Sequence, residues 1–361
     1  MPTRALVTSY AQDLALFPDR WHRLGLVLFS ALLLTLPWVA DPRWLSVSNL
    51  ALVAIVGSVA LMILTGFAGQ ISMGHAAFLA LGAYTTAVLG EQWALPFWLA
   101  LPAGGAVAAA VGLAIGPFAL RLRGLYLAIV TLGLVFLVNH MLLTFSDLTH
   151  GVSGIAVPMV TWFGAEASAT DFRSATQWGG LRVVGDQKLY FLFLALATGA
   201  VWVGKNIQRS NTGRAMMAVR DQDLAASVLG VDPARTKVTA FGLSSFLAGI
   251  AGGMFALQQQ YITIEPPFDL NMSIEYIAMI VLGGMGTVFG AVAGAVALVA
   301  LSPLAEIVGR QLPLIERLSS AQQSTVLFSA LVLAVLVFEP MGLLGLWLRI
   351  KRYFAAWPFR Y

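Results

Sequence analysis

Long apolar runs, separated by short polar or charged segments, make up most of the 361-residue chain. A helix needs about 20 mostly apolar residues to cross the hydrocarbon core of a membrane. The pattern therefore predicts an all-α polytopic membrane protein with about ten transmembrane helices. The expected spans are Leu24–Ala40, Val47–Thr65, Ile71–Gly90, Pro96–Leu120, Leu125–Phe145, Leu189–Gly204, Val238–Leu257, Ser273–Leu282, Val288–Ile307 and Thr325–Leu346.

The span over Ser273–Leu282 covers only about half a bilayer, because a helix rises about 1.5 Å per residue. Its place in the count therefore depends on the positive-inside rule. With ten spans and the N-terminus inside, only six of the 21 basic residues lie outside, and these are Arg43, Arg173, Arg182, Lys188, Arg310 and Arg317. Merging the short span with its neighbour would put the basic C-terminal tail outside. The charges favour ten crossings and two cytosolic termini.

This topology divides the chain into a cytosolic segment 1–23, a transmembrane domain 24–348 and a basic cytosolic tail 349–361. The first apolar run follows a long leader and lacks a good cleavage site, so we expect an uncleaved span. An external loop over 146–188 contains Trp162 and Trp178. It is either a plain connection or a docking surface for an external partner. A cytosolic loop covers 205–237.

Composition agrees with a membrane protein and excludes several chemistries. Only 11% of the residues are charged, against about 25% in soluble domains. The chain has no cysteine, which excludes disulfides, thiolate metal ligands and a cysteine nucleophile. It also lacks a G-x-x-x-x-G-K-[ST] phosphate loop, HExxH and GxSxG. We therefore expect a non-catalytic chain without a metal that does not bind ATP by that route.

A glycine-rich break interrupts an uncharged stretch at residues 66–78, GFAGQISMGHAAF. Polar side chains at membrane depth usually face a protein interior or a water path, and broken helices in transporters present backbone groups to cargo. The candidates for a translocation path or gate are Gln70, Ser72, Gly74 and His75. The alternative is a tight turn in which His75 merely packs against neighbouring backbone.

A second glycine-rich run covers residues 282–294, LGGMGTVFGAVAG. Glycines four residues apart let another helix approach closely. This pattern is more typical of helix packing than of substrate contact. It predicts a packing seam formed by Gly283, Gly284, Gly286, Gly290 and Gly294.

The third element is a polar, helix-forming segment at residues 211–231, NTGRAMMAVRDQDLAASVLGV. Asp221 and Asp223 suit an N-cap and a first helical turn, and Gly230 suits the position after a helix end. Asp232 and Pro233 then fit the start of the next helix. The pattern predicts a short amphipathic helix on the cytosolic side, which either rests on lipid headgroups or docks on a partner.

Together these elements resemble the M-type permease subunit of branched-chain amino acid (Liv-type) ABC importers. The resemblance runs from about Leu45 to the C-terminus and includes Gly82-Ala-Tyr84 and the tail motif 340–345, PMGLLG. Segment 205–237 corresponds to the coupling loop of that family, with the pattern E-A-A-x-x-x-G. This chain has Leu224 where the acid stands, and Asp223 lies one residue earlier. The resemblance implies ATPase-coupling roles for Gly213, Arg214, Arg220, Asp223, Ala225, Ala226 and Gly230.

The resemblance also implies a type II ABC importer permease in a bacterial inner membrane. Its partners would be a homologous H-type permease, two cytosolic ABC ATPases that bind ATP and Mg²⁺, and a periplasmic substrate-binding protein. The chain itself would bind no cofactor. Residues 75–78 favour branched-chain amino acids, whereas a urea or short-chain amide importer is the alternative. An ion-coupled secondary transporter fits less well, since Glu275, Glu306 and Glu339 lie near span ends.

Overall fold

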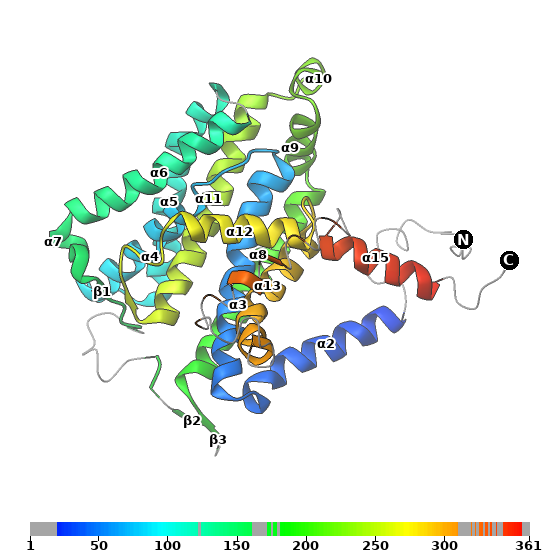
Figure 1. The fold of residues 1–361 in the computed structure, drawn as a ribbon. Coiled ribbons are helices and arrows are strands. Elements are labelled where there is room, and N and C mark those ends of the chain that lie inside the picture. Colours follow the sequence, from blue (N-terminus) through cyan, green and yellow to red (C-terminus); the bar gives the residue numbers. More distant parts are fainter. Residues whose placement is uncertain are drawn as a thin grey trace.

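The computed structural model describes residues 20–121, 124–160, 172–174, 176–178, 181–309 and 342–355, together with 319, 322, 325–327, 329–330, 333 and 337. These parts are mostly helical (Figure 1). The main helices are α2 (Arg20–Val39), α3 (Pro42–Leu61), η1 (Met62–Phe67), α4 (His75–Glu91), α5 (Phe97–Arg121), α6 (Leu125–Thr144), α8 (Gly185–Arg209), α9 (Asn211–Asp221), α10 (Asp223–Val228), α11 (Pro233–Gln259), α12 (Leu270–Gly283), α13 (Val288–Gly309) and α15 (Gly342–Ala355).

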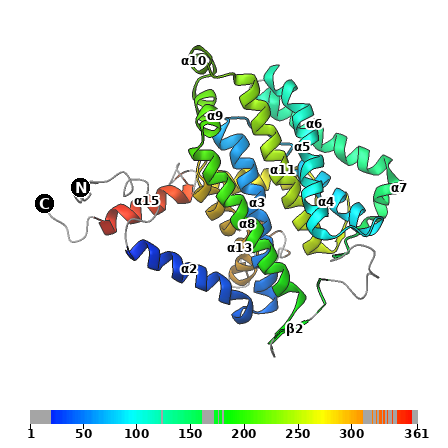
Figure 2. The ribbon, with the colours of Figure 1, turned by 180° about the vertical axis from the view of Figure 1, so that it is seen from behind.

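The core of the bundle forms where α11 packs against α3, α4 and α5. In the most apolar stretches of α3–η1 and of α11, 83% of the residues are buried inside the protein, against 28% in α8. Ser244 of α11 donates a hydrogen bond of 2.7 Å to the carbonyl of Ala60 on α3. Seen from behind, α8 and α13 run beside α3, while α2 and α15 extend away from the bundle (Figure 2).

Within the described residues, five helices are long and apolar enough to cross a membrane: Pro42–Phe67, Phe97–Phe118, Tyr126–Thr144, Gly185–Arg209 and Pro233–Gln259. The count reaches six if the bent pair Leu270–Gly283 and Val288–Leu301 forms one span. The chain is therefore a helical polytopic membrane protein, and in its described parts these helices fall short of the ten expected crossings. The expected span Thr325–Leu346 lies largely outside the described residues.

Two further expected spans are helical but short. The span over Ile71–Gly90 corresponds to α4, a helix of 17 residues, and the apolar part of α2 is limited to Val27–Val39. The expected spans Ser273–Leu282 and Val288–Ile307 correspond to α12 and α13. The chain bends by 120° between these two helices, across a short break where Gly284 and Gly286 have φ of 112° and 84°.

The external loop expected over 146–188 is described in part. It contains α7 (Ser146–Thr149), the 3₁₀ turn η2 (Gly151–Ser153), β1 (Ile155–Ala156), β2 (Thr176–Trp178) and β3 (Leu181–Val183). β1 pairs with β4 (Tyr261–Ile262), and β2 pairs with β3, both antiparallel. Arg173 forms an ion pair of 2.7 Å with Asp186 at the start of α8. Trp162 lies outside the described residues, and Trp178 ends β2.

Candidate functional site

The segment α9–α10 is shaped by its capping residues. Ser210 starts α9 by accepting a hydrogen bond from the amide of Gly213 at 3.1 Å. Gly213 leaves no room for a Cβ, which would collide with the carbonyl of Ile207. Asp221 ends α9 instead of capping the next helix, and Gln222 is the N-cap of α10. Asp223 occupies the first turn of α10, where the helix dipole stabilises a negatively charged carboxylate.

The end of α10 follows the expected motif. Gly230 has φ of 86°, and its amide donates to the carbonyl of Ser227 while the amide of Val231 donates to that of Ala226. This pair of bonds is a Schellman motif.

Asp232 then caps α11, since its Oδ1 accepts from the amides of Ala234 at 2.9 Å and Arg235 at 3.3 Å. Both ends of the short helix are thus fixed by local hydrogen bonds.

α10 lies at the tip of the molecule (Figure 1), and two of its apolar residues and the residue that follows it are largely exposed. Leu224, Val228 and Leu229 are 76%, 86% and 82% exposed. The family resemblance gives the neighbouring Ala225 and Ala226 the same coupling role. The structure separates them, because Ala225 is exposed whereas Ala226 is buried within the chain. An isolated apolar tip of this kind is typical of a surface that a partner covers.

Arg220 ties the end of α9 to the break in the membrane helix. Its Nη1 donates a hydrogen bond of 2.8 Å to the carbonyl of Gly66 in η1, and its Nη2 is paired with Asp221 at 2.9 Å. Gly69, with φ of 68°, allows this approach, because a Cβ there would lie 2.5 Å from Cγ of Arg220. A Cβ on Gly66 would lie 3.0 Å from the amide nitrogen of Gly286. Arg220 therefore reaches the point where η1 meets the α12–α13 connection.

The four gate candidates separate into two groups. Ser72 and His75 are each 1% exposed and Gly74 is buried. The His75 ring packs edge-on against Tyr276 at 4.9 Å between centroids, and Ser72 Oγ accepts from the amide of Gly74 at 3.2 Å. These three residues lie in the packed interior. Gln70 shares the non-helical link between η1 and α4 with Ser72 and Gly74, but it is the one of the four candidates that lines a cleft.

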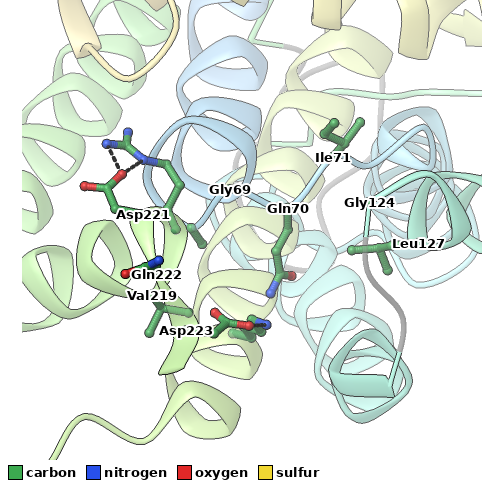
Figure 3. A pocket seen from close by; sticks show the side chains of 12 residues that line it. Gly69, Gln70, Ile71, Gly124, Leu127, Val219, Asp221, Gln222 and Asp223 are labelled. Atoms are coloured by element: carbon green, nitrogen blue, oxygen red, sulfur yellow. Dashed lines mark hydrogen bonds and ion pairs between the residues drawn. The ribbon is translucent and has the colours of Figure 1, made fainter. Parts of the chain in front are cut away.

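Gln70 lines a cleft of about 330 Å³ between this link and the α9–α10 segment. In Figure 3 the Gln70 side chain extends toward Asp223, with Asp221 and Gln222 on the opposite wall. Asp223 forms an ion pair of 2.8 Å with Lys237 of α11. The cleft is lined by Ala68, Gly69, Gln70, Ile71, Gly124, Leu127, Val219, Arg220, Asp221, Gln222, Asp223 and Lys237.

The remaining coupling candidates lie outside this cleft. Arg214 is exposed and hydrogen-bonds within its own segment, to the carbonyl of Arg209 at 3.1 Å and to Asn211. Gly213, Ala225, Ala226 and Gly230 do not line the cleft either. The structure therefore brings Gln70, Arg220 and Asp223 together and places the other candidates around them.

The glycine seam lies within the α12–α13 pair. A Cβ on Gly283 would collide with the carbonyl of Gly290, and a Cβ on Gly294 with that of Met279. A Cβ on Gly290 would also collide with the carbonyl of Gly284. Gly286 lies in the connection instead of on α13. The close approach thus holds the two arms of the bend together.

Three contacts in the structure were not predicted from the sequence. Lys237 is the last residue of the expected cytosolic loop 205–237, and its charge enters the sequence argument only through the orientation of the chain. The hydrogen bond from Arg220 to Gly66 ends on a backbone carbonyl, which every residue type has, so the sequence contains no signal for it. Asn139 of α6 is buried and donates to Glu265 at 2.7 Å and to the carbonyl of Phe268 at 3.0 Å; a polar residue within an apolar run was its only signal.

Metal binding has no candidate in the described parts of the chain, where no group of three or more His, Asp or Glu residues is close enough to hold an ion. The polar side chains that line the cleft include two ion pairs, Arg220–Asp221 and Asp223–Lys237, and the amide of Gln70. Such groups bind and release polar ligands or transmit movement.

Comparison with known proteins places this architecture in one family. Residues 44–338 match the family model of the branched-chain amino acid transport system permease component. The chain is 33% identical over 331 residues to the high-affinity branched-chain amino acid transport system permease protein LivM of Escherichia coli K12, covering 90% of this chain and 75% of that protein.

Two further relatives come from Salmonella typhimurium LT2. Its LivM is 33% identical over 316 residues, or 85% of this chain and 71% of the relative. Its high-affinity branched-chain amino acid transport system permease protein LivH is 28% identical over 300 residues, or 78% of this chain and 87% of the relative. No solved structure matches the chain significantly. The extent of the family match shows that this chain belongs to the permease components of branched-chain amino acid transport systems.

Proposed function

We propose that this chain is the transmembrane permease subunit of an ATP-driven importer of branched-chain amino acids. Its relatives are permease proteins of high-affinity branched-chain amino acid transport systems. The proposed complex contains a homologous H-type permease, two cytosolic ABC ATPases with ATP and Mg²⁺, and a periplasmic substrate-binding protein. The chain spans the bacterial inner membrane about ten times with both termini in the cytosol. It carries out no covalent chemistry.

The observation that carries this proposal is the construction of the α9–α10 segment. Its tip exposes Leu224, Val228 and Leu229, while its base is tied to the bundle at two points. Arg220 bonds to the Gly66 carbonyl of η1, and Asp223 pairs with Lys237 of α11. A segment that is apolar at its free end and anchored by charge at its base is suited to transmit a partner's movement.

The mechanism follows from these anchors. ATP binding closes the ATPase pair, which moves α10. The Asp223–Lys237 pair passes the displacement to α11, and Arg220 passes it to the end of η1. Residues 68–74 form no regular helix, so the chain bends there without breaking the hydrogen bonds of a helix. The contact of Gly66 with Gly286 extends the movement to the α12–α13 bend. The permease pair thereby alternates between outward and inward access.

Reconstitution tests the proposal. The chain is co-expressed with the genes that neighbour it, and the complex is placed in proteoliposomes with its binding protein. We expect ATP-dependent uptake of radiolabelled L-leucine. ATP-dependent uptake of urea or acetamide without leucine uptake would favour the amide importer instead. Uptake driven by an ion gradient by this chain alone would contradict the proposal.

The docking role of α10 has its own variant. Leu224→Arg places a charge at the exposed tip, so we expect co-purification of the ATPases to be lost while this chain still inserts into membranes. Val152→Arg is the matched control, since Val152 is 84% exposed on η2, away from α10. Undiminished ATPase recovery with Leu224→Arg would contradict docking at this tip.

A further inference from the structure

The Gln70 side chain is buried but uncommitted. It is 5% exposed, yet neither its Nε2 nor its Oε1 has a hydrogen-bond partner among the described residues. Its backbone is fixed, because its amide donates to the carbonyl of Leu64 at 3.1 Å and its carbonyl accepts from Thr65 at 3.0 Å. A buried amide without partners is costly in a folded protein. Its position in the wall of the cleft suggests a ligand as the missing partner.

Charges of both signs surround this amide. Arg220 and Lys237 line the cleft together with Asp221 and Asp223. The side chains of Lys237 and Asp223 are 12% and 23% exposed, so solvent screens their fields only in part. A ligand with a single charge would be repelled by the cleft charges of the same sign. A ligand that carries both signs on neighbouring atoms has partners for each.

The remaining wall of the cleft is apolar. Leu127 and Val219 are buried there, and Ile71 is 43% exposed. The volume of about 330 Å³ lies at the lower end of the range for small-molecule sites, about 300–1,000 Å³. The cleft thus combines an amide, two ion pairs and an apolar side in a space suited to a small molecule.

We propose that this cleft is a binding site for a zwitterionic α-amino acid with an apolar side chain, occupied on the coupling-segment side of the membrane. The Gln70 amide hydrogen-bonds the head group, Asp223 faces the ammonium group, and Arg220 and Lys237 face the carboxylate. Leu127 and Ile71 contact the side chain. The site rests on the proposed function and extends it to a station that the substrate occupies before release. Because Arg220 and Asp223 also anchor the coupling segment, occupancy and movement share the same residues.

Thiol labelling of the assembled complex tests this site. The chain has no cysteine, so Ile71→Cys introduces its only thiol in the cleft wall while Gln70 stays intact. N-ethylmaleimide modification of this chain is followed by mass spectrometry, without ATP or the binding protein. We expect L-leucine at about ten times its Kd to slow labelling about tenfold, because occupancy then leaves roughly a tenth of the sites open. Thr212→Cys, exposed on α9 outside the cleft, should show no protection.

Ligand analogues and a second substitution sharpen the result. 4-Methylpentanoate lacks the ammonium group and 3-methylbutylamine lacks the carboxylate, so neither should protect. Gln70→Leu in the Ile71→Cys background should remove protection by leucine, whereas Gln208→Leu on α8 should preserve it. Equal protection by the single-charge analogues, or protection that survives Gln70→Leu, would overturn the site.

The outcomes separate this site from the proposed function. A complex that imports leucine without protecting Ile71→Cys would refute the site and leave the importer intact. Protection by acetamide, in a complex that imports amides, would refute both the zwitterion and the branched-chain assignment.

Discussion

Two regions of the molecule are built in opposite ways. Where α4 crosses α11, Gly82 and Gly249 bring two backbones together, and a Cβ on Gly82 would collide with the Gly249 carbonyl. At the cleft, α9 and α10 meet the rest of the chain through directional polar bonds around a cavity of about 330 Å³. The first region has almost no tolerance for displacement. The second has a few contacts that can break and reform.

This difference indicates which parts move. A net hydrogen bond contributes about 0.5–1.5 kcal/mol, which is small enough to be exchanged during a transport cycle. Overpacking a dense interface costs about 1–3 kcal/mol or more for each misplaced group. The α3–α4–α5–α11 bundle therefore acts as a rigid body, and the Arg220 and Lys237 contacts act as the joint that links it to α10.

The largest expected effect comes from disrupting the rigid region. A Cβ at Gly252 would collide with the carbonyl of Leu79, so Gly252→Leu should destabilise the fold by about 3 kcal/mol or more. We expect little monodisperse protein in detergent, measured by fluorescence-detected size-exclusion chromatography. Gly199→Leu is the control, because nothing lies within 4 Å of a Cβ there. A normal yield for Gly252→Leu would show that this crossing is not rigid.

An intermediate effect is expected at the joint. Lys237→Ala leaves the partly buried Asp223 carboxylate without the lysine that it pairs with at 2.8 Å. Removing one member of such a pair costs about 2 kcal/mol, between the values for exposed and fully buried pairs. ATP-dependent leucine uptake should fall more than tenfold at normal protein yield. The exchanged pair Asp223→Lys with Lys237→Asp should recover part of it, and an absence of any coupling between the two sites would argue against this joint.

The smallest effect is expected at the end of α10. Gly230 has φ of 86° with open space around it, so Gly230→Ala costs only backbone strain, about 1 kcal/mol. Hydrogen exchange of the α10 amides should quicken about fivefold, as that free energy implies. Gly230→Asn should change the rate less, because asparagine tolerates this conformation. Equal rates for glycine, alanine and asparagine would mean that the cap does not hold the helix.

Local signals in the sequence predicted the end of α10 and the start of α11, whereas Asp221, expected as an N-cap, ends α9 instead. Gly230, Asp232 and Pro233 act through hydrogen bonds to residues within a few positions, so their types and order predict the α10 end and the α11 start. Glycines also predicted an interruption of the helix at residues 66–70; the structure has it slightly later, at residues 68–74, because η1 continues to Phe67. The family assignment was also predicted from these motifs and is confirmed by the match over residues 44–338.

Contacts between distant segments had no comparable signal. The bond from Arg220 to Gly66 joins residues 154 positions apart through a backbone carbonyl, which no side-chain pattern records. The seam glycines predicted a close approach but not that its partner is the adjacent helix. The burial of Ala226 was missed because Ala225 and Ala226 look alike in sequence while a helix points them 100° apart.

The central claim is that Arg220 transmits the movement of α10 to η1. The most direct test is the ratio of leucine transported to ATP hydrolysed by the reconstituted complex with Arg220→Ala. The account predicts ATP hydrolysis within about twofold of the unmodified complex and a loss of uptake of at least about tenfold, the size expected when about 1.4 kcal/mol of coupling disappears. Arg235→Ala, at a side chain 89% exposed, should keep the normal ratio. An unchanged ratio with Arg220→Ala would contradict the account.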